Sequence, residues 1–328
     1  MVKRLSILAL CGVFVAQALL PAASTLMSRL GFRGARFSVP LAASAASPFL
    51  TVGQALPPAH GPSPRRIVST APSATEMLYA LGLGDRVVGV TTFCHYPPEA
   101  ATKPKIGDYL HPSLETIVGL RPDLVVAETT GVRHAETLRS LNLNVLQIDD
   151  ATIAGIYDSI QRIGRAAGVP ARADTLCAQM RAQLDAIRAK VGALPRRRVL
   201  FLVGRTPGRI EDLIAAGRRS HLNELMEIAG GDNVFRDSIA AYGKIPLEEL
   251  LARNPEVIVD MGEMSETVGV TEARKRAVVE LWTRYPALAA VREHRVYAVA
   301  SDIFVVPGPR VVDAARALAR MFHPEAGL

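Results

Sequence analysis

Apolar and polar positions follow two regular patterns along most of the chain. Short runs of β-branched residues, which predict strands, are separated by segments with helical spacing. In the first half, strands are expected at 65–69, 87–90, 123–127 and 145–148, and helices at 73–81, 113–120 and 136–141. Ser73 precedes Glu76 by three residues, the spacing of a capping box that would begin the first helix. Strands that alternate with helices favour a parallel sheet covered on both faces.

The middle of the chain lacks a strand pattern from residue 153 to residue 194. Residues 171–191 predict a helix of about six turns at ~3.6 residues per turn. Its apolar stripe consists of Leu176, Met180, Leu184, Ile187 and Val191. A second series follows, with strands at 199–203, 257–260 and 296–299 and a last helix at 310–322. We therefore expect two α/β lobes, 64–170 and 195–328, joined by one long helix within 171–194 and separated by a cleft.

The two halves also share a repeat. Residues 114–126 (LETIVGLRPDLVV) align without gaps with residues 247–259 (LEELLARNPEVIV), and the Leu, Glu, Pro and apolar positions keep register. Helix–Pro–strand junctions can look alike by chance. A common frame over 13 positions at equivalent places in two lobes favours a duplication instead.

The N-terminal segment has the features of an export signal. A basic pair at 3–4 is followed by sixteen uncharged residues and then by small ones, which is typical of a secretory signal peptide over 1–24. An uncleaved anchor and lipidation at Cys11 are the alternatives. A second signal-like arrangement starts at Met27, so 25–63 is either a low-complexity tether or that second segment. We expect a periplasmic protein, with a membrane-anchored form as the alternative.

Composition and charge exclude several classes of protein. The chain has 328 residues, of which 49% are hydrophobic and 21% charged, so it can bury a core and is neither disordered nor fibrous. The net charge of +7 comes mainly from residues 1–63, which hold five basic and no acidic side chains. The remainder is nearly neutral, with 33 basic and 31 acidic residues. A nucleic-acid partner is therefore not expected.

A set of short motifs occurs in fixed order through the two predicted lobes. These are IVSTAPSATE at 67–76, VVGV at 87–90, YPP at 96–98, KIG at 105–107, LE at 114–115 and LRPDLV at 120–125, then SD at 301–302 and PGPR at 307–310. The set closely resembles the substrate-binding proteins of cobalamin and iron-chelate ABC importers. The Tyr-Pro-Pro segment makes it most similar to the periplasmic cobalamin-binding branch. The resemblance extends over residues 65–323.

This resemblance implies a fold and a role. The fold would be that of a helical-backbone, class III periplasmic binding protein, with two Rossmann-like α/β lobes, little hinge motion and no enzymatic activity. It would be a monomer that carries cobalamin or an iron chelate to the membrane permease of an ABC importer, with ATPase subunits behind it. Glu115 and Glu248 match the glutamates that dock on arginines of the permease. A carboxylate at the start of a helix is also favoured by the helix dipole, so a purely local role is the alternative.

Ligand contacts are expected in the loops beyond the carboxyl ends of the strands. Aromatic faces and a few polar groups suit a broad, flat corrin with amide-bearing edges. The candidate aromatic side chains are Phe93, Tyr96, Tyr109, Tyr242 and Phe304. The resemblance implies that Tyr109 and Tyr242 stack on the ligand and that Asp302 contacts it. Ala71, Ser73 and Arg310 complete the predicted contacts.

A ferric siderophore and haem are the alternative ligands to cobalamin. A ferric siderophore, which is usually anionic, would favour cationic side chains such as Arg133, Arg205, Arg209, Arg218 and Arg310. Haem could take His95 or a tyrosine as axial ligand. We therefore keep both as alternative ligands, and His95 as the candidate metal contact.

Direct metal binding and catalysis find less support. His95, His111 and His134 follow consecutive predicted strands and could bind zinc or manganese, although histidines in loops are often merely solvated. Cys94 could add a ligand, and its pairing with Cys177 is left open. An α/β two-lobe enzyme is disfavoured because the chain has no nucleophile elbow and no phosphate-binding loop.

Overall fold

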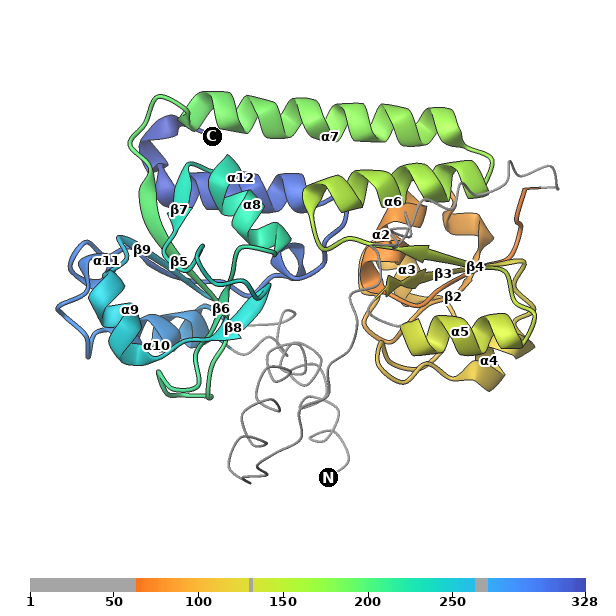
Figure 1. Ribbon diagram of the computed structural model, residues 1–328, viewed down its shortest axis with the longest axis horizontal. Coiled ribbons are helices and arrows are strands. Elements are labelled where there is room, and N and C mark those ends of the chain that lie inside the picture. Colours follow the sequence, from red (N-terminus) through yellow and green to blue (C-terminus); the bar gives the residue numbers. More distant parts are fainter. Residues whose placement is uncertain (1–62, 130–131, 263–270) are drawn as a thin grey trace, which may run out of the picture.

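The computed structural model describes residues 63–129, 132–262 and 271–328, with the side chains of 132–134 left out. The predicted signal peptide, the segment at 25–63 except its last residue, and His134 as a ligand lie outside the described residues. Figure 1 shows two α/β lobes side by side, with one long helix, α7, running along both. The predicted fold class is confirmed. In the described part of the chain, no helix is long and apolar enough to span a membrane.

The N-terminal lobe is built on a parallel four-stranded sheet. Its strands lie in the order β2-β1-β3-β4. They are β1 (Ile67–Ser69), β2 (Val87–Gly89), β3 (Leu124–Glu128) and β4 (Val145–Ile148). The helices of this lobe are α2 (Pro72–Ala80), α3 (Pro98–Ala101), α4 (Leu114–Gly119), α5 (Val132–Ser140) and α6 (Ile153–Ala166), with a 3-10 turn η1 (Gly84–Arg86).

The C-terminal lobe has a mixed six-stranded sheet. Its order is β10-β9-β5-β6-β8, and β7 pairs with β5. The strands are β5 (Arg197–Gly204), β6 (Ile214–Ala216), β7 (Gly231–Asn233), β8 (Tyr242–Lys244), β9 (Val257–Asp260) and β10 (Val296–Ala298). The helices are α8 (His221–Ile228), α9 (Leu247–Arg253), α10 (Glu272–Trp282), α11 (Ala289–Arg292) and α12 (Val311–Phe322), with 3-10 turns η3 (Asp302–Phe304) and η4 (Pro324–Ala326). Strands β6 and β8 pair antiparallel with each other, and their sequences, IAA and YGK, lack the run of β-branched residues by which the other short strands were predicted.

Helix α7 (Pro170–Val191) joins the lobes through a shared core. Its 22 residues span about 33 Å at 1.5 Å per residue. Proline at the first position suits a helix start, because the missing N–H would be unpaired there anyway. The buried face is Ala173, Cys177, Met180, Leu184, Ile187 and Val191, so the predicted stripe is right except for the partly buried Leu176. These side chains belong to one apolar cluster that includes Ile67 in the first lobe and Phe201 in the second.

The two predicted repeats form equivalent hydrogen bonds in the two lobes. Arg66 N donates to Asp123 Oδ1 at 2.9 Å in the first lobe, and Arg198 N donates to Glu256 Oε2 at 2.9 Å in the second. Each of these arginines also donates a side-chain N–H to a backbone carbonyl at the C-terminal end of a helix. Arg66 donates to Leu120 at the end of α4, and Arg198 donates to Arg253 at the end of α9. Arg121 and Asn254, at matching repeat positions, both have left-handed φ values, 44° and 45°. The two lobes are thus built by the same junction.

The predicted capping box at the start of α2 is wrong. The N-cap residue is Ala71, without a side-chain cap, and Ser73 already lies inside the first turn. The Glu76 side chain is buried and pairs with Arg310, 234 residues away. This ion pair across the lobes replaces a local backbone contact that a capping glutamate would have made.

Arg310 ties the lobes together at this point. Its Nε donates to Glu76 Oε2 at 3.0 Å, and its Nη1 and Nη2 donate to Asp302 at 3.0 and 2.9 Å. The guanidinium also stacks 4.0 Å from the centre of the Tyr96 ring. Burial raises the pKa of Glu76, and the contact with Arg310 opposes that shift. A Cβ at Gly308 would lie 3.0 Å from Glu76 Oε2, so glycine leaves room for the pair.

A second polar contact joins the lobes beneath α7. The backbone N–H of Ile153, at the start of α6, donates to Glu224 Oε2 of α8 at 2.5 Å. One orphan donor of α6 is thus satisfied by the other lobe.

Replacing Glu76 with alanine tests the interlobe ion pair. The change removes the buried Glu76 carboxylate and leaves the partly buried guanidinium of Arg310 with one carboxylate instead of two, so we expect a loss of about 3 kcal/mol in the free energy of unfolding. Urea denaturation measures it. Glu99→Ala removes an exposed carboxylate of the same lobe and serves as the control. Equal stability of the two variants would contradict this role of Glu76.

Candidate functional site

The carboxyl ends of β1, β3 and β4 meet at one edge of the N-terminal sheet, because these strands are adjacent and parallel. Just beyond them lie Ser73 in the first turn of α2, Glu128 at the end of β3, and Asp150 two residues after β4. Ser73 was predicted to contact the ligand, whereas Glu128 and Asp150 were not. The signal that could have found them is an acidic residue at the end of each of two apolar runs.

Two predicted tyrosines converge on these carboxyls from opposite lobes. The Tyr109 hydroxyl donates to Glu128 Oε2. Tyr242, the first residue of β8 in the C-terminal lobe, has its pKa raised by burial and by the charges of Asp150 and Glu128. We call the group formed by Ser73, Tyr109, Glu128, Asp150 and Tyr242 the interlobe site.

The Asp150 carboxyl is the most deeply buried acid of this site. Its exposed fraction is 2%, and its Oδ2 has no hydrogen-bond partner among the residues described. Burial and the neighbouring Glu128 raise its pKa well above the usual range, and a hydrogen bond from Ser73 opposes that shift. The raised pKa favours the neutral form of Asp150, and a neutral carboxyl can donate as well as accept a hydrogen bond.

The other predicted contacts lie in different surroundings. Tyr96 is exposed at 44% and covers the guanidinium of Arg310, while Phe93 is partly buried. Arg310 donates to both Asp302 and Glu76, so its charge is already paired with these two carboxylates. This group borders α2 and the start of α12.

Two predicted contacts have side chains that are packed away. Ala71 is fully buried in the core. Phe304 is 2% exposed, its ring lies 5.7 Å from that of Phe201, and its carbonyl oxygen is hydrogen bonded to His221 Nε2 at 3.0 Å. An aromatic residue in a loop was expected to offer a face, but here it fills the core of the second lobe.

The histidines and cysteines do not assemble into a metal centre in the described part of the chain. There, no group of three or more His, Cys, Asp or Glu side chains is placed to hold a metal ion. His95 and His111 are both exposed. Cys94 and Cys177 are free and buried, and burial raises the pKa of each thiol. Cys94 instead contacts Thr75 and Thr91, at 3.1 and 3.2 Å, so its sulfur serves packing.

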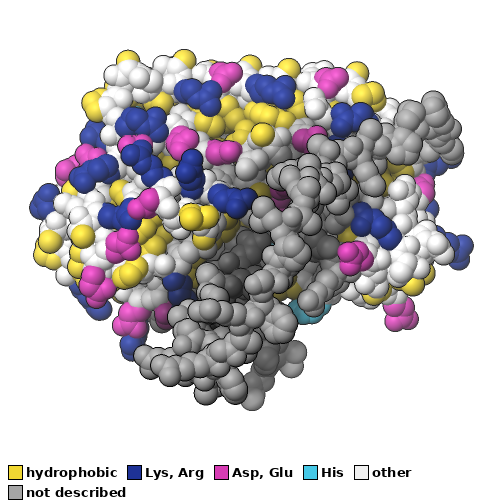
Figure 2. Space-filling model, in the orientation of Figure 1, with side chains coloured by type: hydrophobic (Ala, Val, Ile, Leu, Met, Phe, Trp, Pro, Cys, Tyr) yellow, Lys and Arg dark blue, Asp and Glu magenta, His cyan; other side chains and the backbone are white. Residues whose placement is uncertain are grey.

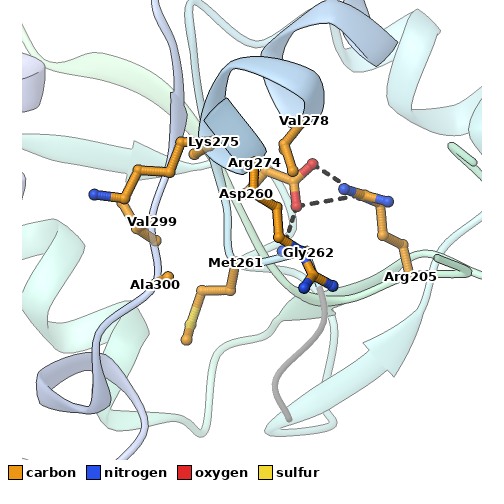
Figure 3. Close-up of a pocket in the computed structure, with 10 residues that line it drawn as sticks. Arg205, Asp260, Met261, Gly262, Arg274, Lys275, Val278, Val299 and Ala300 are labelled. Carbon is orange, nitrogen blue, oxygen red and sulfur yellow. Dashed lines mark hydrogen bonds and ion pairs between the residues drawn. The ribbon is translucent and has the colours of Figure 1, made fainter. Parts of the chain in front are cut away.

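A small cavity in the second lobe contains a satisfied ion pair. Figure 3 shows the Asp260 carboxylate accepting from Arg205 and from the backbone of Gly262. Trp282 Nε1 donates to the same carboxylate at 2.8 Å. The cavity measures about 30 Å³, enough for one water molecule. The arrangement stabilises the end of β9, and the positive charge of Arg205 is paired with the Asp260 carboxylate.

The visible face of the molecule carries side chains of both charges. Figure 2 shows Lys and Arg side chains interspersed with Asp and Glu over the C-terminal lobe, while apolar side chains gather along α7. A phosphate-binding surface would require basic side chains clustered on one face.

Comparison with known proteins agrees with this geometry. The sequence profile of the periplasmic binding protein family matches residues 67–303. The chain is 32% identical to an uncharacterized ABC transporter substrate-binding lipoprotein of Bacillus subtilis, over 80% of this chain and 81% of that one. It is 27% identical to the vitamin B12-binding protein of Vibrio parahaemolyticus, over 76% and 86% of the two chains.

Solved structures show the same fold. The periplasmic vitamin B12 binding protein of Vibrio cholerae is 26% identical with a TM-score of 0.68, covering 81% of this chain and 98% of that one. A periplasmic heme-binding protein from Roseiflexus is 27% identical with a TM-score of 0.67, covering 80% and 99%. The resemblance read from the motifs is confirmed. The chain belongs to the periplasmic binding protein family, whose members bind solutes and are not enzymes.

Proposed function

We propose that this protein captures a corrinoid, cobalamin, between its two lobes and delivers it to an ABC importer. The observation that carries the proposal is the convergence of Tyr109 and Tyr242 from opposite lobes on one group of carboxyls. Such a site offers aromatic surface from both sides and a few polar anchors, which suits a broad ring with amide edges. The relatives named as vitamin B12-binding proteins support the same ligand.

The paired arginines argue against an anionic siderophore. Arg310 is neutralised by Glu76 and Asp302, and Arg205 is neutralised by Asp260. Arg209 lies 3.5 Å from Glu211. At Arg205 and Arg310 an anionic chelate would have to compete with these carboxylates; Arg209 and Arg218 are exposed, and the Arg133 side chain lies outside the described residues. A ligand without a large negative charge avoids that competition.

Haem is the second candidate ligand. His95 is exposed in the loop that also holds Tyr96, where an imidazole nitrogen can reach an iron atom. The similarity to heme-binding proteins of known structure is as close as that to the vitamin B12 binding protein. Haem would then bind through His95 or a tyrosine.

The site of action that we propose is outside the cytoplasm. The signal-like segment at 1–24 supports export to the periplasm, and the lipoprotein relative supports a membrane-anchored form as the alternative. The protein would act there as a monomer, with the permease and its ATPase subunits as partners.

Glu115 and Glu248 are the residues that we propose for permease docking. Both are exposed in the first turn of a helix, α4 in one lobe and α9 in the other, at matching repeat positions. In Figure 1 these helices lie on the side of the molecule away from α7. Neither carboxylate has an ion-pair partner among the described residues, whereas the adjacent Glu249 is paired with Arg253. Two unpaired carboxylates suit bidentate arginine partners on another protein.

Titration of the purified protein with cyanocobalamin tests the ligand. We expect submicromolar binding by calorimetry, and a weakening of at least about tenfold in Tyr242→Ala because the ring is lost from the interlobe site. Tyr285→Ala removes an aromatic side chain that packs beside Trp282 and is the control. Haemin and a ferric siderophore are titrated in parallel. Binding of either in place of cobalamin would contradict the corrinoid assignment.

The double variant Glu115→Ala, Glu248→Ala tests docking. We expect unchanged affinity for the ligand and no transport in vesicles that contain the cognate permease and ATPase, since the carboxylates lie outside the interlobe site. Glu99→Ala with Glu280→Ala removes one other exposed carboxylate from each lobe and should transport normally. Loss of ligand affinity in the Glu115/Glu248 variant would contradict the assignment of these two residues to permease docking.

A further inference from the structure

The two carboxyls of the interlobe site form a polar subsite with a defined chemistry. Ser73, Glu128 and Asp150 come from segments that follow three adjacent parallel strands, so the fold itself brings them together. Tyr109 donates to Glu128 from the same lobe, and Tyr242 faces the pair from the other lobe. The described contacts of these two carboxyls include no arginine or lysine. They differ in this from Glu76, Asp260 and Asp302, each of which is paired with an arginine.

The second observation is an unpaired atom. Asp150 is 98% buried, and its Oδ2 has no hydrogen-bond partner in the part of the chain described. A buried oxygen without a partner costs free energy that a bound group can recover by supplying one. Asp150 lies where the two lobes meet, within the electrostatic reach of Tyr242. The missing partner is thus expected from a molecule held between the lobes.

The charge of the pair limits what that partner can be. Among the described residues no cation contacts Glu128 or Asp150, so a carboxylate or a phosphate brought against them would lose its hydration without gaining a positive partner. A neutral amide has no such penalty, and its N–H can donate to Asp150 Oδ2. Its carbonyl oxygen can accept a hydrogen bond from the neutral form of Asp150, which the raised pKa favours.

We propose that Asp150 and Glu128, with Ser73, form a subsite that accepts an uncharged amide edge of the ligand and rejects an edge that carries a carboxylate. This inference rests on the proposed function and deepens it, because it states which part of a ring-shaped ligand faces the N-terminal lobe. Corrinoids carry amides at the rim, whereas haem carries two propionates. The subsite is therefore a specificity determinant between these two classes.

Single-amide hydrolysis of the ligand supplies the test. Cyanocobalamin and its monocarboxylic acids, in which one rim amide has become a carboxylate, are titrated against the purified protein by calorimetry. We expect the parent to bind at least about tenfold more tightly than the monocarboxylate whose acid group enters the subsite. Asp150→Asn should reduce that preference to below about threefold, because the asparagine amide supplies an N–H donor from which a ligand carboxylate can accept a hydrogen bond. Asp149→Asn, next to it and exposed, should keep the full preference.

Further measurements distinguish failure of the subsite from failure of the corrinoid function. Glu128→Gln repeats the test if Asp150→Asn fails to fold, which thermal unfolding reports. Equal binding of cyanocobalamin and every monocarboxylate to the wild type would overturn the subsite and leave the corrinoid function standing. If haemin binds and cobalamin does not, the corrinoid function fails. In that case the subsite survives only if haem dimethyl ester binds more tightly than haemin and Asp150→Asn removes the difference. Absence of binding by all of these ligands would overturn both.

Discussion

The continuous apolar core along α7 is the constraint on which the rest of the structure depends. The helix buries one face against both lobes, so neither lobe can rotate far without exposing side chains such as Met180 and Leu184. The ion pair between Glu76 and Arg310 adds a polar connection at a second point. Because a buried guanidinium is costly to leave unpaired, this contact resists separation of the lobes. The groups of the interlobe site are consequently held near fixed positions relative to one another.

Internal pairing of charges explains the chemical character of the region between the lobes. Arg205 is buried and Arg310 is partly buried, and both are held by carboxylates of the same chain. Within the interlobe site, Glu128 and Asp150 have no cationic partner among the described residues. A protein arranged in this way presents hydrogen-bonding groups and aromatic rings rather than a cationic surface. This is the physical basis on which we rank an amide-bearing ligand above an anionic one.

Local patterns in the sequence predicted the elements and failed on contacts between distant residues. The strand at 145–148 and the helix at 171–191 are marked by apolar periodicity, and the structure places β4 and α7 there. The repeat at 114–126 and 247–259 is visible because the same junction is built twice. The Ser73–Glu76 spacing predicted a capping box that does not form, because the Glu76 side chain pairs with Arg310, 234 residues away. The burial of Phe304 against Phe201 is likewise a tertiary effect that no local sequence pattern shows.

Solution scattering of the free and the cobalamin-saturated protein tests most directly whether the two lobes form a nearly preformed site. A single long helix with a core on both lobes predicts that the radius of gyration changes by less than about 1 Å on binding, as in other preorganised complexes. A decrease of several ångströms, with the lobes closing as rigid bodies about a hinge, would contradict the account.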